Sequence, residues 1–132
     1  MTRGEFLMIP QTERRIRTLK CSVAALRELA TSLSAPLGGD RVQSSGVSDR
    51  TGRLVAEIAD AEAAIIEQLR RLATLRLEAY RLINTLPDPE QSVAYLRYIV
   101  GLTWERVGEE SGYDARYCKR LGRRALDYLF PQ

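Results

Sequence analysis

The chain of 132 residues contains no histidine and only two cysteines, Cys21 and Cys118. The absence of histidine removes the usual general base near neutral pH, the Ser-His and Cys-His nucleophile pairs, and the commonest metal ligand. The two cysteines lie far apart and in no CxxC spacing, so neither a zinc site nor a secreted disulfide framework is indicated. We therefore expect a protein of the reducing cytoplasm that holds no metal and no other cofactor.

Long apolar runs are also missing. Residues 6–9 are apolar but end at Pro10, a run far too short for a signal-peptide core or a membrane span. With 45% hydrophobic and 28% charged residues, the chain can bury a core in water, and we expect no membrane partner. The acidic residues Asp60, Glu62 and Glu67 read as the solvated face of an amphipathic helix. We expect no enzymatic activity and nominate no catalytic residue.

Two amphipathic helices are predicted in residues 1–86, at about 11–33 and 48–86. Proline, glycine and serine gather between them, which predicts a linker over 34–47. The apolar residues of both helices recur in steps of three and four, as in a coiled-coil seam. The first seam contains Ile16, Leu19, Val23, Leu26, Ala30 and Leu33. The second contains Leu54, Ile58, Ala61, Ile65, Leu72, Leu75, Ala79, Leu82 and Leu86, and is widened by Val55, Leu69 and Ile83.

The two helices differ in length. At 1.5 Å per residue the second would extend roughly 58 Å and the first roughly 35 Å, so a folded hairpin would leave part of the longer seam uncovered. Either the C-terminal domain or a second subunit must cover the remainder, and we favour a homo-oligomer. Gln68 interrupts the second seam; it either sets the register or, as we favour, lies at the edge of the seam. Residues 1–86 are thus predicted to be a helical oligomerisation region.

Residues 87–132 have the pattern of a helix-turn-helix domain. Asp88 and Pro89 suit a helix start, and a second helix, Trp104 to Ser111, follows Thr103 as its N-cap and ends at Gly112. Asp114 then caps a helix from Ala115 to about Leu129. The small core is predicted to contain Val107, Tyr113, Cys118 and Leu121. Gly108 and Ser111 depart from the usual pattern, where alanine and a larger apolar residue are expected. The predicted fold is therefore all-α: a long helical hairpin or coiled coil followed by a three-helix helix-turn-helix domain.

The last helix is strongly basic, although the net charge of the chain is only +3. No acidic residue occurs between Ala115 and Leu126. A basic run on an isolated helix is more often a solvated face, but the second helix of a helix-turn-helix enters the major groove. We expect Arg116, Lys119 and Arg120 to read base edges, and Arg123 and Arg124 to contact the DNA backbone. The start of the helix, Asp114, Ala115 and Tyr117, completes the predicted DNA-binding set.

The segment from Gln91 through Leu126 resembles region 4 of bacterial sigma factors. The resemblance rests on Tyr95-Leu96-Arg97-Tyr98-Ile99, on Gly101-Leu102-Thr103-Trp104-Glu105, and on Gly112-Tyr113 leading into the basic helix that ends Arg124-Ala125-Leu126. With the Gly38-Gly39-Asp40 linker and the long helix ending Leu86-Pro87-Asp88-Pro89, the chain is similar to a family of small phage and prophage proteins. The late-gene transcription regulators RinA and ArpU are related in type.

The resemblance implies a sequence-specific transcription regulator that binds double-stranded DNA, beside RNA polymerase. A complete sigma factor would also need a promoter-melting domain, and residues 1–90 offer no room for one. Two alternatives stay open. One is an oligomeric DNA-recognition subunit of phage DNA packaging, similar to a small terminase; the other is an adaptor that binds RNA polymerase through its long helices without contacting DNA.

Overall fold

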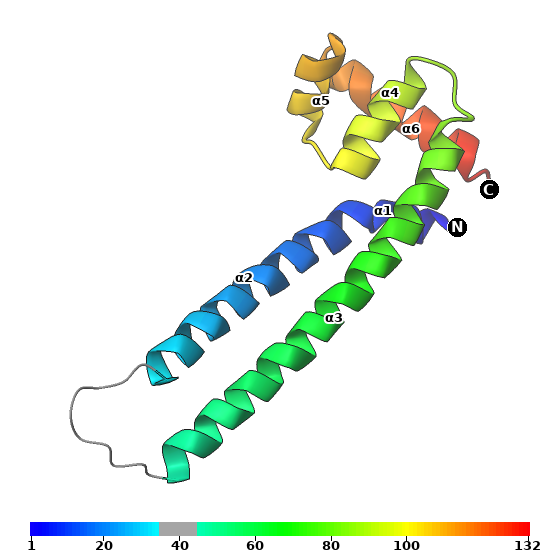
Figure 1. Cartoon of the computed structure of the whole chain (residues 1–132). Helices are drawn as coiled ribbons and strands as arrows, with labels where there is room; N and C mark the ends of the chain where they lie inside the picture. Colours follow the sequence, from blue (N-terminus) through cyan, green and yellow to red (C-terminus); the bar gives the residue numbers. More distant parts are fainter. Residues whose placement is uncertain (35–44) are drawn as a thin grey trace. The chain divides into compact units, whose positions relative to one another are not determined.

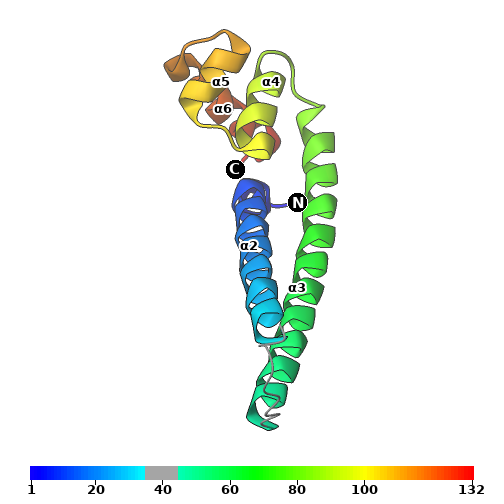
Figure 2. The same cartoon turned by 60° about the vertical axis from the view of Figure 1, so that its left-hand side comes forward.

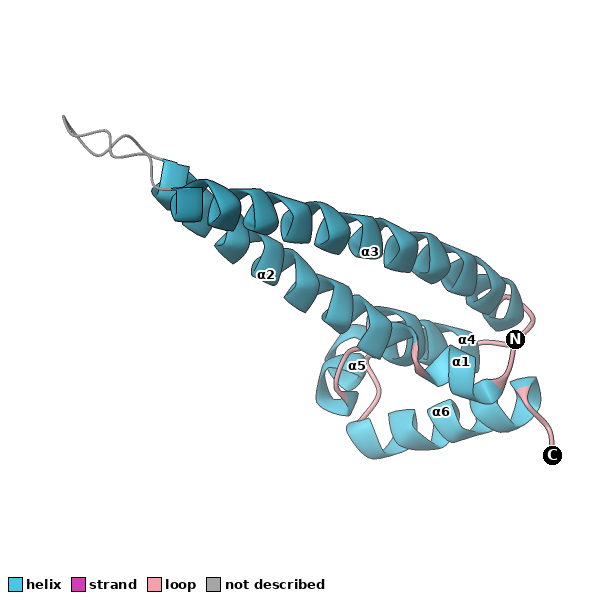
Figure 3. Ribbon diagram, turned by 90° about the horizontal axis from the view of Figure 1, so that it is seen from below, coloured by secondary structure: helices cyan, strands magenta, loops and turns pink. Residues whose placement is uncertain are grey.

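The computed structural model describes residues 1–34 and 45–132, with side chains described outside 34 and 45–48. Within these residues the protein is all-α, as predicted, and contains no strand (Figures 1 and 3). The elements are α1 Arg3–Leu7, α2 Ile9–Ser34, α3 Ser45–Ile83, α4 Glu90–Ala94, the π-helix η1 Tyr95–Val100, α5 Trp104–Ser111 and α6 Ala115–Leu129. Most of the predicted linker lies outside the described residues, but residues 45–47 already belong to α3 and not to a linker.

The chain divides into two compact units, residues 14–69 and residues 1–13 with 70–132. In the unit of residues 14–69, α2 and the first part of α3 run antiparallel side by side (Figures 1 and 2). The predicted seams supply its buried side chains, which are Ile16, Val23, Leu54, Ile58 and Ile65. Leu33, at the end of the first predicted seam, is 40% exposed. An ion pair between Arg27 and Glu62 joins the two helices at the surface.

The other unit combines the two ends of the chain, which differs from the predicted boundary at residue 86. The apolar run at residues 6–9 covers the end of α1 and the start of α2, a region for which the sequence predicted no helix. The ring of Phe6 is fully buried, and its centroid lies 5.4 Å from those of both Tyr98 and Phe130. Thr2 and Glu5 form a capping box at the start of α1. The N-terminus is therefore part of the same hydrophobic core as the C-terminal helices.

The second part of α3 contributes to this core as well. Leu72, Ala79 and Ile83 of α3, and Leu86 just after it, are buried within the single chain. Together with Leu54, Ile58 and Ile65 in the other unit, most of the predicted seam is covered without a second subunit. Val55 and Leu69, which widen the predicted seam, are 55% and 39% exposed. Whether a second subunit covers them stays a prediction.

The C-terminal helices pack around a cluster of Val93, Val107, Cys118 and Leu121, with Leu96, Leu102, Trp104 and Tyr117 at its edge. Three of the four predicted core positions are confirmed, because Val107, Cys118 and Leu121 are fully buried. The prediction for Tyr113 is wrong: its side chain is 40% exposed. Gly112 reverses the chain in the left-handed region with φ 82°, and the Tyr113 ring instead pairs edge-on with Tyr117 at the surface, 5.3 Å between centroids.

Candidate nucleic-acid interface

A three-residue turn joins α5 to α6. Capping hydrogen bonds are present at both ends of α5 and at the start of α6. The Thr103 hydroxyl accepts a hydrogen bond from the Arg106 amide at the start of α5. The amide of Gly112 donates to the carbonyl of Gly108 over 2.9 Å as α5 ends. At the start of α6, Oδ1 of Asp114 accepts from the Tyr117 amide over 2.8 Å. This helix, turn and helix arrangement is compatible with the predicted helix-turn-helix.

The two departures from the usual pattern have a structural explanation. A Cβ at Gly108 would lie 2.7 Å from the carbonyl oxygen of Tyr113, so only glycine allows the turn to approach α5 this closely. The Ser111 hydroxyl accepts a hydrogen bond from the Tyr113 amide over 3.4 Å and lies 3.5 Å from Sγ of Cys118. Both residues thus stabilise a tight turn, which compensates for the lower helix propensity of Gly108.

Trp104 and Gly122 set the position of α6. A Cβ at Gly122 would lie 2.5 Å from Cη2 of Trp104, so the indole ring rests directly on the backbone of α6. The Arg97 guanidinium lies over the same ring, 4.6 Å from the ring centroid. Arg97 also donates to the carbonyl of Leu102 over 2.8 Å. The roles of Arg97 and Gly122 could not be predicted from the sequence, because helical spacing does not reveal which residues of different helices meet.

Tyr98 packs beside this contact and is almost fully buried. Burial raises the pKa of its hydroxyl above the ordinary value of 10.0, and the positive charges of Arg97, Arg3 and Arg123 oppose the rise. The hydroxyl oxygen would lie 2.9 Å from a Cβ at Gly122. Tyr98, like Trp104, therefore restricts position 122 to glycine.

The five basic side chains of α6 all lie on its exposed surface. Arg116, Lys119, Arg120, Arg123 and Arg124 are exposed, whereas the opposite face is buried and consists of Cys118, Leu121, Gly122, Ala125 and Leu126. Arg124 lies 3.8 Å from a carboxylate oxygen of Glu90, but its side chain is 62% exposed, so this ion pair is weak. The Arg120 guanidinium lies 5.9 Å from the centroid of the Tyr117 ring. The predicted basic surface is thus open to solvent along α6.

The other predicted site residues differ in what they can contribute. Asp114 is exposed, but its carboxylate already caps α6. Ala115 is half-buried, and Tyr117 is half-buried because its ring packs against the hydrophobic cluster. Asp127, which sequence analysis did not single out, is exposed one turn after Arg123 and ends the basic surface with a negative charge. The first three turns of α6 are therefore the strongly positive part.

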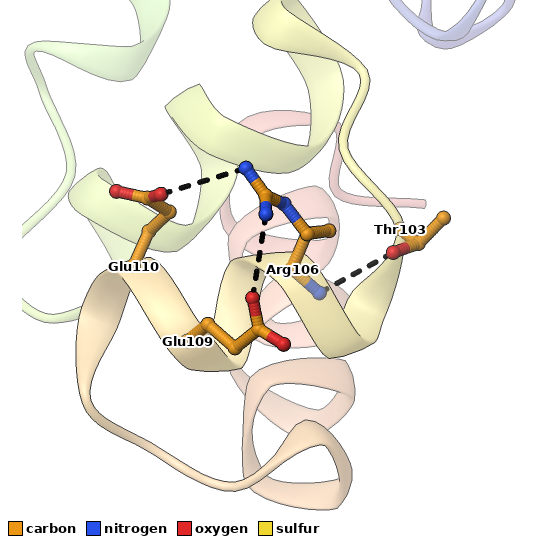
Figure 4. A network of polar contacts seen from close by, with 4 residues as sticks. All are labelled: Thr103, Arg106, Glu109 and Glu110. Atoms are coloured by element: carbon orange, nitrogen blue, oxygen red, sulfur yellow. Dashed lines mark hydrogen bonds and ion pairs between the residues drawn. The ribbon is translucent and has the colours of Figure 1, made fainter.

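The surface of α5 has the opposite character (Figure 4). Its one basic residue, Arg106, lies 3.5 Å from Glu109 and 3.8 Å from Glu110. Glu105 adds a third exposed carboxylate. A polyanion would therefore meet no net positive charge on α5. Of these two helices, only α6 carries a net positive charge.

In the part of the chain that the structure describes, no group of three or more histidine, cysteine, aspartate or glutamate side chains could hold a metal ion. In the same part, no helix has the length and apolar character needed to cross a lipid bilayer. Comparisons with protein-family models, with curated proteins and with solved structures give no match to this chain.

Proposed function

We propose that the protein binds double-stranded DNA through α6 and acts as a transcription regulator of the phage and prophage type, working as a homo-oligomer beside RNA polymerase. The observation that carries the proposal is the division of α6 into two faces: five exposed basic side chains on one and a fully packed core on the other. The regulatory role comes from the resemblance of residues 91–126 to sigma factor region 4.

The shape of the basic surface favours a duplex over other polyanions. An α-helix is about 10–12 Å across with its side chains, and the major groove of B-DNA is about 12 Å wide. In a helix-turn-helix the residues near the start of the second helix contact base edges. Arg116, Lys119 and Arg120 occupy that part of α6, and none of them forms an ion pair with a carboxylate among the residues whose side chains the structure describes. They are our candidates for base contacts, and Arg123 and Arg124 for phosphate contacts.

Selection from a pool of random duplexes tests this proposal. We expect the wild-type protein to enrich a defined sequence, and the Arg116→Ala, Lys119→Ala, Arg120→Ala variant to lose that preference. The physical reason is that a bidentate contact between arginine and guanine contributes about 1–3 kcal/mol of discrimination. The matched control is Lys20→Ala, Arg50→Ala, Arg53→Ala, which removes the same charge from exposed positions outside α6 and should keep the preference.

Two results would contradict the proposal. If the wild-type protein enriches no sequence, it does not bind DNA sequence-specifically. An unchanged preference in the α6 variant would place DNA recognition elsewhere. If neither the wild-type protein nor the α6 variant binds duplex DNA, but both capture RNA polymerase, the adaptor alternative replaces the DNA-binding proposal.

A further inference from the structure

The N-terminal helix α1 packs beside the end of α6, within the same compact unit. The ring of Phe6 is fully buried, and its centroid lies 5.4 Å from those of Tyr98 and of Phe130, the C-cap residue of α6. The Tyr98 hydroxyl oxygen would lie 2.9 Å from a Cβ at Gly122. Because Gly122, Leu126 and Phe130 are spaced by four residues, they follow one side of α6. The contacts of Phe6 and Tyr98 therefore place α1 and η1 along that side.

Two exposed basic residues of α6 border the same side. At 3.6 residues per turn, Lys119 and Arg123 lie roughly 60° and 100° around the helix from Gly122. Asp127 and Arg124 lie further away, at roughly 140° and 160°. The carboxylate of Asp127, and the carboxylate of α4 that is paired with Arg124, are therefore on the far part of the exposed surface. The edge of α6 nearest to α1 is positively charged.

Arg3 brings a further positive charge to this edge. It precedes Phe6 by three residues in α1, so the two side chains are neighbours on one face of that helix. Burial raises the pKa of the Tyr98 hydroxyl, and the positive charges of Arg97, Arg3 and Arg123 oppose the rise. Arginines from both ends of the chain thus lie close enough to act on one hydroxyl group.

The side chain of Arg3 is free to bind a partner. It is exposed and forms no ion pair with a carboxylate among the residues whose side chains the structure describes. The carboxylate of α1, that of Glu5, accepts a hydrogen bond from the Thr2 amide over 2.9 Å. Arg97, by contrast, is half-buried, lies over the Trp104 ring and donates to a backbone carbonyl. Arg3 and Arg123 are therefore the arginines around Tyr98 that face solvent.

We propose that Arg3 contacts the DNA backbone beside α6, so that both ends of the chain form the binding surface. The inference rests on the proposed binding of DNA by α6 and adds a residue outside that helix. An α-helix about 10–12 Å across fills a major groove about 12 Å wide, so the phosphates of the two strands border its sides. Arg3 and Arg123 contact the strand on the side of Gly122. A phosphate contact carries no sequence information.

The salt dependence of duplex binding by Arg3→Ala tests the proposal. Fluorescence anisotropy is measured on the duplex that the wild-type protein selects and on a random duplex of equal length. The slope of log K against log salt should become shallower by about 0.9 per bound chain. The affinity should fall by the same factor on both duplexes, because the lost contact is with the backbone. Arg3→Lys keeps the charge and should keep the slope.

The matched control is Arg71→Ala, which removes one exposed arginine from α3 in the same unit and should leave the slope unchanged. Arg3→Gln keeps part of the side-chain stem and should reproduce the slope of Arg3→Ala. Thermal denaturation verifies that each variant is folded.

Three results would overturn the inference. A slope that Arg123→Ala makes shallower and Arg3→Ala does not would remove Arg3 from the interface and leave the proposed DNA binding in place. A loss of affinity confined to the selected duplex would mean that Arg3 reads bases and not the backbone. If the wild-type protein binds neither duplex, the proposed function and this inference fail together.

Discussion

Single residues determine how α6 is held, and the glycines show it most clearly. Gly108 and Gly122 each lie where a Cβ would collide with a neighbour, the Tyr113 carbonyl in one case and the Trp104 ring in the other. In the sequence, Gly108 is only a departure from the helix-turn-helix pattern, at a position where alanine is expected. Only the three-dimensional contacts reveal the reason, because the colliding groups come from other segments of the chain. The exposure of the basic residues, by contrast, follows from their spacing on α6 and was predictable.

Replacing Gly108 by alanine should therefore destabilise the protein, although alanine is the better helix former. A backbone oxygen at 2.7 Å cannot move without displacing the turn, so we expect a loss of about 1–3 kcal/mol in the free energy of unfolding. Gly52→Ala is the matched control: nothing lies within 4 Å of a Cβ there, and alanine should increase stability by up to about 1 kcal/mol. Urea denaturation measures both. Equal effects of the two substitutions would refute the role assigned to Gly108.

At the scale of elements, the long helices and the helix, turn and helix pattern could be predicted from periodicity and capping residues. The Thr103 and Asp114 caps and the left-handed Gly112 are present in the structure. Two elements could not be predicted. The stretch Tyr95–Val100 is a π-helix, which differs from an α-helix only in its hydrogen-bond register and has no sequence signature. The five-residue α1 is too short for periodicity and owes its position to the burial of Phe6.

The cap of α6 gives a test that separates two ways in which Asp114 can stabilise the helix, as a hydrogen-bond acceptor or as a negative charge. Asp114→Ala removes the acceptor for the Tyr117 amide and should lower the free energy of unfolding by about 1 kcal/mol. Asp114→Asn keeps an acceptor and removes the negative charge, so stability should change little. Thermal denaturation measures both variants. A similar loss in Asp114→Asn and Asp114→Ala would mean that the charge, and not the cap, is what stabilises the start of α6.

At the scale of the whole molecule, the helical period predicts most of the buried residues of the seam, but it does not decide what covers them. The C-terminal domain and a second subunit are both possible covers by helix length alone. The chain buries Leu54, Leu72 and Leu86 itself, and the N-terminus joins the C-terminal helices in one unit. The second subunit stays a prediction. Of the three residues predicted to widen the seam, Ile83 is buried, whereas Val55 and Leu69 are exposed. Which of two apolar faces is covered depends on tertiary packing, and a helical period alone does not decide it.

The most direct test of DNA binding by α6 is the dependence of duplex affinity on salt concentration. Each phosphate contact contributes about 0.9 to the slope of log K against log salt. Arg123→Ala with Arg124→Ala should make the slope shallower by about 1.8 per bound chain, while Arg50→Ala with Arg53→Ala should leave it unchanged. Slopes that are identical in the wild-type protein and the α6 variant would contradict the account, because the exposed arginines of α6 would then not touch the DNA backbone.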